Sequence, residues 1–170
     1  MYQTSVIIAL GSNVGNYLIN FKNTFNEISK FSIIKSIGNI YVSKPYGYKK
    51  QNNFYNTAIE ILTFCQPIEL LNRLEIIENK LIKNKKILNG PRKIDIDIIF
   101  YGNKIIKNNK INIPHPRASE RDFVLKPIND FKPFYRHPTT KLTVKETLNK
   151  LNSNYIIKSL DRRYLIKKFF

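Results

Sequence analysis

The sequence predicts an α+β fold of the ferredoxin-like, split βαβ type, with helices packed on a mainly antiparallel sheet in three αβα layers. Two observations predict it. Stretches of strand-like and helix-like apolar spacing follow one another in the order β-α-β-β-α-β. The 170 residues contain no internal repeat and no linker that would separate two halves, so we expect a single domain over residues 1–170.

The first half supplies four of these elements. Residues 4–10 form an apolar strand that ends at the turn cluster Gly-Ser-Asn. Residues 16–31 place apolar side chains at helical spacing. Two strands are expected over about 33–43 and 54–64, and the Tyr-, Lys- and Gly-rich loop between them is too long for a tight hairpin.

The second half begins with a helix opened by a proline and ends with a capped helix. In order, we expect a helix over 67–84, a strand over 94–101, a hairpin partner for that strand over 103–113, a loop with a short helix over 114–123, and a helix from the capping box Thr143–Glu146 to about residue 151. No element is assigned to the tail, residues 155–170.

Composition limits the classes of protein to consider. No apolar run approaches the roughly 18 residues of a membrane helix, and the N-terminus lacks the basic region of a signal peptide. The single cysteine, Cys65, excludes an intramolecular disulfide. We therefore expect a cytoplasmic protein with no membrane partner.

The charge is strongly basic, with 29 Lys+Arg against 12 Asp+Glu and a net charge of +17. Such a chain is a candidate for binding polyanions. The excess is mostly lysine, is spread along the chain, and accompanies many Ile and Asn residues, which is typical of drift toward AT-rich codons. A basic module that binds single-stranded nucleic acid therefore stays as a rival interpretation and not as the favoured one.

Arginine is informative because it is scarce. Arg92, Arg117 and Arg121 lie within thirty residues of each other. Lysine replaces arginine poorly where a planar guanidinium grips phosphate oxygens in a bidentate manner. Arg117 and Arg121, together with His115 between two prolines, are interpreted as phosphate or ribose contacts, although a loop histidine with a purely structural hydrogen bond is the alternative for His115.

The stretch GPRKIDIDIIF (90–100) places two carboxylates, Asp95 and Asp97, on one face of a strand about 6.6 Å apart. Either this is an acidic solvent face, or it is a platform for Mg²⁺, which shares oxygen ligands with substrate phosphates. Arg92 then either neutralises the pair or holds the far side of a polyphosphate. We expect Ile94, Ile96 and Ile98 to point into the core, and Lys93, Ile99 and Tyr101 to share the face of the aspartates.

An aromatic group with one amide forms the remaining candidate site. Its members are Tyr46, Tyr48, Phe54, Tyr55, Asn56 and the distant Phe123. Two rings can sandwich a flat heterocycle while the amide donates to and accepts from its edge. Phe64 and Phe100, by contrast, are expected to be core residues. No P-loop and no G-x-G-x-x-G motif is present.

Taken together, these segments resemble the 6-hydroxymethyl-7,8-dihydropterin pyrophosphokinases over about residues 4–130. GPRKIDID (90–97) and PHPRASERDFVLKP (114–127) carry the resemblance, with LGSN (10–13), YVSKPYG (41–47) and FYN (54–56) in support. It implies transfer of pyrophosphate from ATP to the hydroxymethyl group of the pterin in folate biosynthesis, with release of AMP and with two Mg²⁺ ions.

The resemblance also implies roles for individual residues. Asp95 and Asp97 would bind the metal ions and, with Arg92 and Lys83, form the catalytic group. ATP would be bound by Glu78, Lys85, Arg92, Lys110, His115, Arg117 and Arg121. The pterin would be bound by Ser43, Pro45, Tyr46, Phe54, Asn56 and Phe123.

The sequence departs from the family at IKNKKILN (82–89), where the family commonly has G-R-x-R followed by a tryptophan. Lys83 and Lys85 would replace arginines as point charges without a bidentate grip. A catalytically weakened family member is therefore a further alternative. We expect the protein to act as a monomer.

Overall fold

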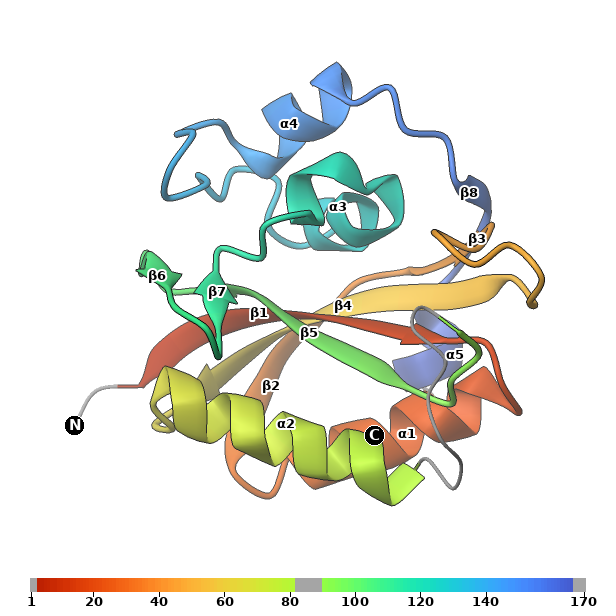
Figure 1. Ribbon diagram of the computed structural model, residues 1–170, viewed down its shortest axis with the longest axis horizontal. Coiled ribbons are helices and arrows are strands. Elements are labelled where there is room, and N and C mark those ends of the chain that lie inside the picture. Colours follow the sequence, from red (N-terminus) through yellow and green to blue (C-terminus); the bar gives the residue numbers. More distant parts are fainter. Residues whose placement is uncertain (1–2, 82–89, 167–170) are drawn as a thin grey trace.

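The computed structural model describes residues 3–81 and 90–166, in which helices cover both faces of a central sheet (Figure 1). The elements are β1 (Thr4–Ser12), α1 (Tyr17–Ile28), β2 (Ser32–Ile37), β3 (Ile40–Ser43), β4 (Phe54–Thr63), α2 (Pro67–Leu81), β5 (Asp95–Tyr101), β6 (Ile106–Lys107), β7 (Asn112–Ile113), the 3-10 turn η1 (Ala118–Glu120), α3 (Asp122–Asn129), α4 (Val144–Lys150), β8 (Ile156–Leu160) and α5 (Arg163–Ile166).

The main sheet is antiparallel throughout, which confirms the predicted fold class. Its order is β5-β1-β4-β3-β8. Strand β2 also pairs with β4, along residues 59–63, whereas β3 pairs with residues 54–56 of the same strand. Helices α1 and α2 cover one face of the sheet, and α3 and α4 lie on the other (Figure 1). This arrangement gives the three expected layers.

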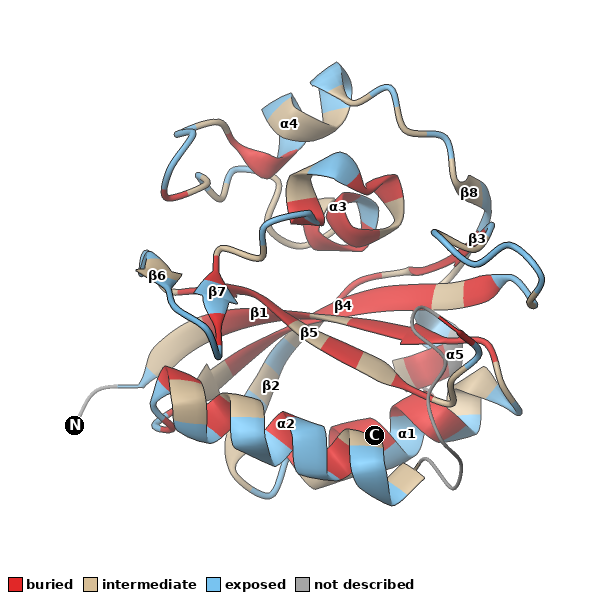
Figure 2. Ribbon diagram, in the orientation of Figure 1, coloured by how far each residue is buried: buried red, intermediate tan, exposed pale blue. Residues whose placement is uncertain are grey.

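Each face of the sheet has its own apolar core, and the buried sides of α1 and α2 face the sheet (Figure 2). Phe21, Phe25 and Leu70 lie in the core under α1 and α2. Ile7, Phe100 and Leu125 lie in the core under α3 and α4. Each fully buried side chain of this size stabilises the fold by about 1.5–3 kcal/mol. Within the described ranges, no helix has the length and apolar character needed to cross a membrane.

The predicted strand over 33–43 is wrong as a single strand. It is divided into β2 and β3 at Gly38 and Asn39, where α3 packs against the chain. A Cβ atom on Gly38 would lie 2.3 Å from the carbonyl oxygen of Pro127, and the Asn39 N–H donates to the Asp130 carboxylate over 2.8 Å. The break is therefore set by a contact with a helix some ninety residues away.

Strand β5 contains a bulge that the alternating isoleucines do not reveal. Ile7 pairs with Phe100 but Ile8 pairs with Ile98, which leaves Ile99 without a partner in β1. The bulge turns Tyr101 into the core under α1 and α2, so the expectation that Tyr101 shares the face of the aspartates is wrong. Ile99 does stay on their side, in the core under α3.

The prediction that residues 103–113 form a hairpin with β5 is wrong. They fold on themselves as the two-stranded sheet β6–β7, because the Asn108 side chain accepts hydrogen bonds from the N–H groups of Lys110 and Ile111, both over 2.9 Å. The prediction for Phe64 is also wrong, since its side chain is 51% exposed after the end of β4. Phe100 is a core residue, as expected.

The predicted helices agree with the structure at their capped ends. Asn16 caps α1, and Thr143 and Glu146 form the expected capping box of α4. The predicted end of α2, residues 82–84, lies outside the described residues. The short helix expected within 114–123 is present as the 3-10 turn η1, and α3 follows it from Asp122. The unassigned tail forms β8 and α5.

Candidate active site

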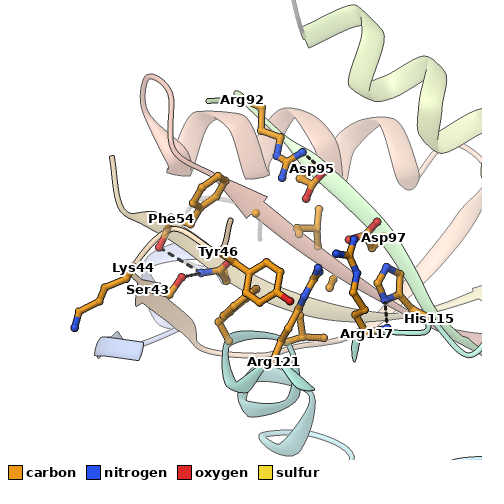
Figure 3. A pocket seen from close by; sticks show the side chains of 16 residues that line it. Ser43, Lys44, Tyr46, Phe54, Arg92, Asp95, Asp97, His115, Arg117 and Arg121 are labelled. Carbon is orange, nitrogen blue, oxygen red and sulfur yellow. Dashed lines mark hydrogen bonds and ion pairs between the residues drawn. The ribbon is translucent and has the colours of Figure 1, made fainter. Parts of the chain in front are cut away.

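A cleft opens on the α3 side of the sheet, with an empty volume of about 840 Å³ including its open mouth. It lies over β1, β4 and β5, and its other wall comes from the 43–46 segment and from the chain around α3 (Figure 3). The lining residues are Ala9, Leu10, Gly11, Ser43, Lys44, Tyr46, Phe54, Asn56, Arg92, Asp95, Asp97, His115, Arg117, Arg121, Phe123 and Val124.

Two carboxylates line the β5 side of this cleft. Asp95 lies opposite Gly11 of β1, and Asp97 lies opposite Ala9. The Arg92 guanidinium is 3.3 Å from the Asp95 carboxylate. Burial raises the pKa of Asp97, and the charges of Arg121, Arg92 and Arg117 oppose this rise. The carboxylate of Asp97 thus lines the cleft among three arginine side chains.

The described residues contain no cluster of three or more His, Cys, Asp or Glu side chains that would enclose a metal ion. Two adjacent carboxylates are the donor set that suits Mg²⁺, because this ion keeps several waters and takes its remaining ligands from substrate phosphates. Glu78 of α2 accepts a hydrogen bond from the Ile96 N–H over 2.7 Å. This contact holds β5 in place between the two aspartates.

Arginines with unused donors face the carboxylates. Arg121 is only 9% exposed and forms no ion pair with any residue of 3–81 or 90–166. Its guanidinium lies 4.5 Å from the ring centre of Tyr46. The Nε atoms of Arg121 and Arg92 are buried without a hydrogen-bond partner. Buried guanidinium donors of this kind suit an anionic ligand such as a phosphate group.

His115 stands beside these arginines as a neutral group. Burial, and then the charges of Arg121 and Arg117, lower its pKa to about 4. Its Nδ1 atom accepts a hydrogen bond from the Arg117 N–H over 3.3 Å. At neutral pH the ring is therefore uncharged, and its Nε2–H is the donor that remains for a ligand.

Aromatic rings and one fixed amide form the other end of the cleft. The NH₂ group of Asn56 donates to the Ser43 hydroxyl over 2.9 Å and to the carbonyl of Tyr41 over 3.1 Å. The NH₂ group is thus directed at these two acceptors. The amide oxygen faces Gly11, where an added Cβ would approach it to 3.4 Å. Phe54 comes from β4, while Tyr46 and Phe123 come from the opposite wall.

Not every residue proposed from the sequence lies at this cleft. Pro45, Glu78 and Lys110 are not among its lining residues, and Lys110 is exposed in the turn between β6 and β7. Lys83 and Lys85 lie outside the described residues. Of the aromatic group, Tyr48 is exposed, and Tyr55 points to the other face of the sheet, where it stacks on Tyr17 at 3.8 Å between ring centres.

Asn13 is a site residue that we did not identify individually from the sequence. Its side-chain oxygen accepts from the Arg92 N–H over 2.9 Å, and its NH₂ group donates to Gln51 over 2.9 Å and to the carbonyl of Asn52 over 3.1 Å. It therefore joins the turn that carries Arg92 to the loop that precedes Phe54. Its signals in the sequence are the turn cluster after the first strand and the LGSN segment (10–13) of the family resemblance.

Comparisons with known proteins match most of the chain to one family. The family model described as 7,8-dihydro-6-hydroxymethylpterin-pyrophosphokinase (HPPK) matches residues 7–133. A protein of Aquifex aeolicus named 2-amino-4-hydroxy-6-hydroxymethyldihydropteridine pyrophosphokinase is 32% identical over 142 residues, which cover 84% of this chain and 89% of that protein. The folic acid synthesis protein FOL1 of Dictyostelium discoideum is 43% identical over 138 residues, covering 81% of this chain and 21% of that protein.

The solved structures agree at the level of the fold. The HPPK-DHPS of Plasmodium falciparum superposes with a TM-score of 0.69 at 17% identity, covering 87% of this chain and 44% of that one. Matches to the first two curated relatives span only about a fifth of their length, 21% and 20%. The match of the family model to three quarters of the sequence, together with the Aquifex relative, shows that the chain belongs to the 7,8-dihydro-6-hydroxymethylpterin-pyrophosphokinase family.

Proposed function

We propose that this chain transfers the pyrophosphoryl group of ATP to the hydroxymethyl oxygen of 6-hydroxymethyl-7,8-dihydropterin, releasing AMP, as a Mg²⁺-dependent enzyme of folate biosynthesis. One observation carries the proposal. A single cleft joins two carboxylates and buried, unpaired arginine donors to a slot of aromatic rings with a fixed amide. The first part suits a polyphosphate, and the second suits a flat heterocycle.

The aromatic end of the cleft would hold the pterin. Phe54 and Phe123 lie on opposite walls, so a heterocycle between them would make ring contacts on both sides. The Asn56 amide oxygen is held by the bonds of its NH₂ group to Ser43 and Tyr41. It would accept a hydrogen bond from an N–H group at the pterin edge, which gives the slot its orientation.

The charged end would hold the triphosphate. Asp95 and Asp97 would bind two Mg²⁺ ions, which supply charge neutralisation at the β- and γ-phosphates when bound. Arg92 and Arg121 would donate to the phosphate oxygens, with His115 as a neutral donor. Arg117, exposed at the rim of the cleft, would add a further positive charge.

The reaction requires little from the protein beyond positioning and charge. The hydroxymethyl oxygen attacks the β-phosphorus, a new P–O bond forms, and the bond between that phosphorus and the α,β-bridging oxygen breaks. AMP leaves with the electron pair, and the hydroxyl proton passes to water. Since phosphoryl transfer of this type depends mainly on in-line placement and electrostatic stabilisation, no dedicated general base is needed.

A nucleotide assay tests the proposal. The purified chain is incubated with ATP and Mg²⁺, with and without the reduced pterin, and the nucleotides are separated. We expect AMP only when the pterin is present and only when Mg²⁺ is available. Formation of ADP would indicate ordinary kinase chemistry instead. Absence of turnover, combined with steeply salt-dependent RNA binding, would favour the nucleic-acid-binding alternative.

The replacement of arginines by Lys83 and Lys85 leads to a separate proposal. If these side chains meet the triphosphate, an ammonium gives one point contact where a guanidinium would give a bidentate one. A Lys83→Arg variant should then release AMP faster than the wild type at saturating substrates. An unchanged or lower rate would argue against a catalytic weakening at this position.

A further inference from the structure

The tail of the chain reaches the aromatic end of the cleft. Residues 155–160 lie beyond the segment matched by the family model, which ends at residue 133. Nevertheless β8 pairs with β3 along the edge of the sheet, with Val42 opposite Lys158 and Ser43 opposite Ile156. Figure 1 shows β8 beside β3. The strand therefore begins next to a pterin-side residue, Ser43.

A buried carboxylate joins this tail to α3. Asp122, the first residue of α3, is buried, and one of its oxygens accepts from the Phe123 N–H over 2.8 Å. The other oxygen accepts from the N–H groups of Tyr155 and Ile156 over 2.9 and 3.1 Å. Asp122 stands between two cleft residues, Arg121 and Phe123, so the tail is bonded directly to the peptide that carries both.

Tyr155 also contacts the opposite side of the aromatic wall. Its carbonyl accepts a hydrogen bond from the Lys44 N–H over 2.9 Å, next to the residues that lead to Tyr46. Its ring lies 5.5 Å from the ring centre of Tyr46 and 5.8 Å from that of Phe123, and it meets Phe123 edge-on at 81°. Tyr46 and Phe123 themselves are 6.3 Å apart. The three rings form a triangle.

Only two of these rings line the cleft. Tyr46 and Phe123 face it, whereas Tyr155 stands behind them and is not a lining residue. The Arg121 guanidinium lies over the same pair, at 4.5 Å from Tyr46 and 6.0 Å from Phe123. A ring that contacts both lining rings from behind, and is bonded through its backbone to both segments that carry them, fixes their separation and tilt.

We infer that Tyr155 and Asp122 are positioning residues that hold Tyr46 and Phe123 at the spacing that the pterin ring requires. This inference rests on the proposed function, because it assigns that wall of the cleft to the pterin. The tail strand is then part of the construction of the substrate site, although its residues do not touch the substrate.

The test compares three variants with the wild type in the AMP assay, with KM measured separately for each substrate. Tyr155→Leu keeps an apolar side chain but removes the ring. We expect its KM for the pterin to rise roughly fivefold, because the loss of one aromatic contact weakens binding by a factor of this size. Its KM for ATP should stay within about twofold of the wild type. Tyr155→Phe keeps the ring and should restore the wild-type KM. Ile157→Ala, an exposed position of β8 at 49% exposure, is the matched control.

The outcomes distinguish a failure of the proposed function from a failure of the positioning role of Tyr155. If the wild type releases no AMP, the proposed function fails. If the wild type is active and Tyr155→Leu shows wild-type KM values, the positioning role fails. A loss of thermal stability with both KM values unchanged would mean that Tyr155 only supports the fold, and would also overturn the inference. If Tyr155→Leu does not fold, Asp122→Asn decides in the same way, because it removes one acceptor for the tail and should raise the pterin KM selectively.

Discussion

The Asp97→Asn variant is expected to gain stability in the absence of ligands and to lose AMP release. Within 3–81 and 90–166, the Asp97 carboxylate forms neither a hydrogen bond nor an ion pair with another residue. Burial raises its pKa, so the ionised form is held in the folded protein at a cost. Asparagine has nearly the same shape without the charge.

Both effects follow from this environment. Because burial disfavours the ionised carboxylate and raises its pKa, removal of the charge should raise the free energy of unfolding measured without ligands. The same change removes one of two carboxylates from the proposed metal platform. Loss of a residue that only supports a metal ligand lowers metal affinity or activity about 10- to 100-fold. Loss of the ligand itself should lower AMP release further. Urea denaturation with EDTA measures the first effect, and the AMP assay measures the second.

Asp130→Asn is the matched control, because Asp130 is a structural carboxylate away from the cleft. It accepts hydrogen bonds from the Tyr41 hydroxyl over 2.9 Å and from the Asn39 N–H over 2.8 Å. Its replacement should lower the free energy of unfolding by on the order of 2 kcal/mol and retain most of the activity. The reasoning is refuted if Asp97→Asn releases AMP at a near-wild-type rate, or if it is destabilised as much as Asp130→Asn.

Three further perturbations test the walls of the cleft. Gly38→Ala places a Cβ 2.3 Å from the carbonyl oxygen of Pro127, so α3 must move. We expect a loss of about 1–3 kcal/mol in urea denaturation and a higher KM for the pterin, and an unchanged unfolding curve would contradict the packing argument. Arg121→Lys keeps the charge but loses the guanidinium, so AMP release should fall about tenfold or more. Equal rates would show that Arg121 does not grip phosphate. The depressed pKa of His115, about 4, lies below its unfolded value, so the unfolded state binds more protons and stability falls as pH drops from about 6.5 toward 4. The elevated pKa of Asp97 acts in the opposite direction, so the comparison is made with His115→Gln, which should lose less stability than the wild type between pH 7 and pH 5. Identical losses would contradict the assignment.

Asn13, which lies outside the two long motifs, links two segments of the chain at the cleft. It joins the Arg92 turn to the loop before Phe54 through three side-chain hydrogen bonds. Arg92 and Phe54 both line the cleft, at its proposed phosphate end and its proposed pterin end. The two ends are thus tied together by a residue that contacts neither proposed substrate group in this arrangement.

The sequence by itself determined the parts of the fold that depend on neighbours along the chain. The apolar periods predicted β1, α1, β4, α2 and β5, and the Thr143–Glu146 pair predicted the start of α4, because caps and amphipathic faces are local properties. The spacing of Asp95 and Asp97 placed both carboxylates on one face in the same way. The two long motifs predicted the family in the same way, because they are short-range patterns of the sequence.

Only the tertiary structure decided the features that depend on contacts between distant segments. Pro127 approaches Gly38 and breaks the strand there, and pairing with β1 produces the bulge at Ile99. Asp122 binds the N–H groups of the tail and brings Tyr155 behind Tyr46 and Phe123. Such contacts join residues from 32 positions apart, for Phe123 and Tyr155, to 109 positions apart, for Tyr46 and Tyr155, and leave no period in the local sequence. The chemistry of the site could therefore be read from its motifs, whereas the walls that hold it in place could not.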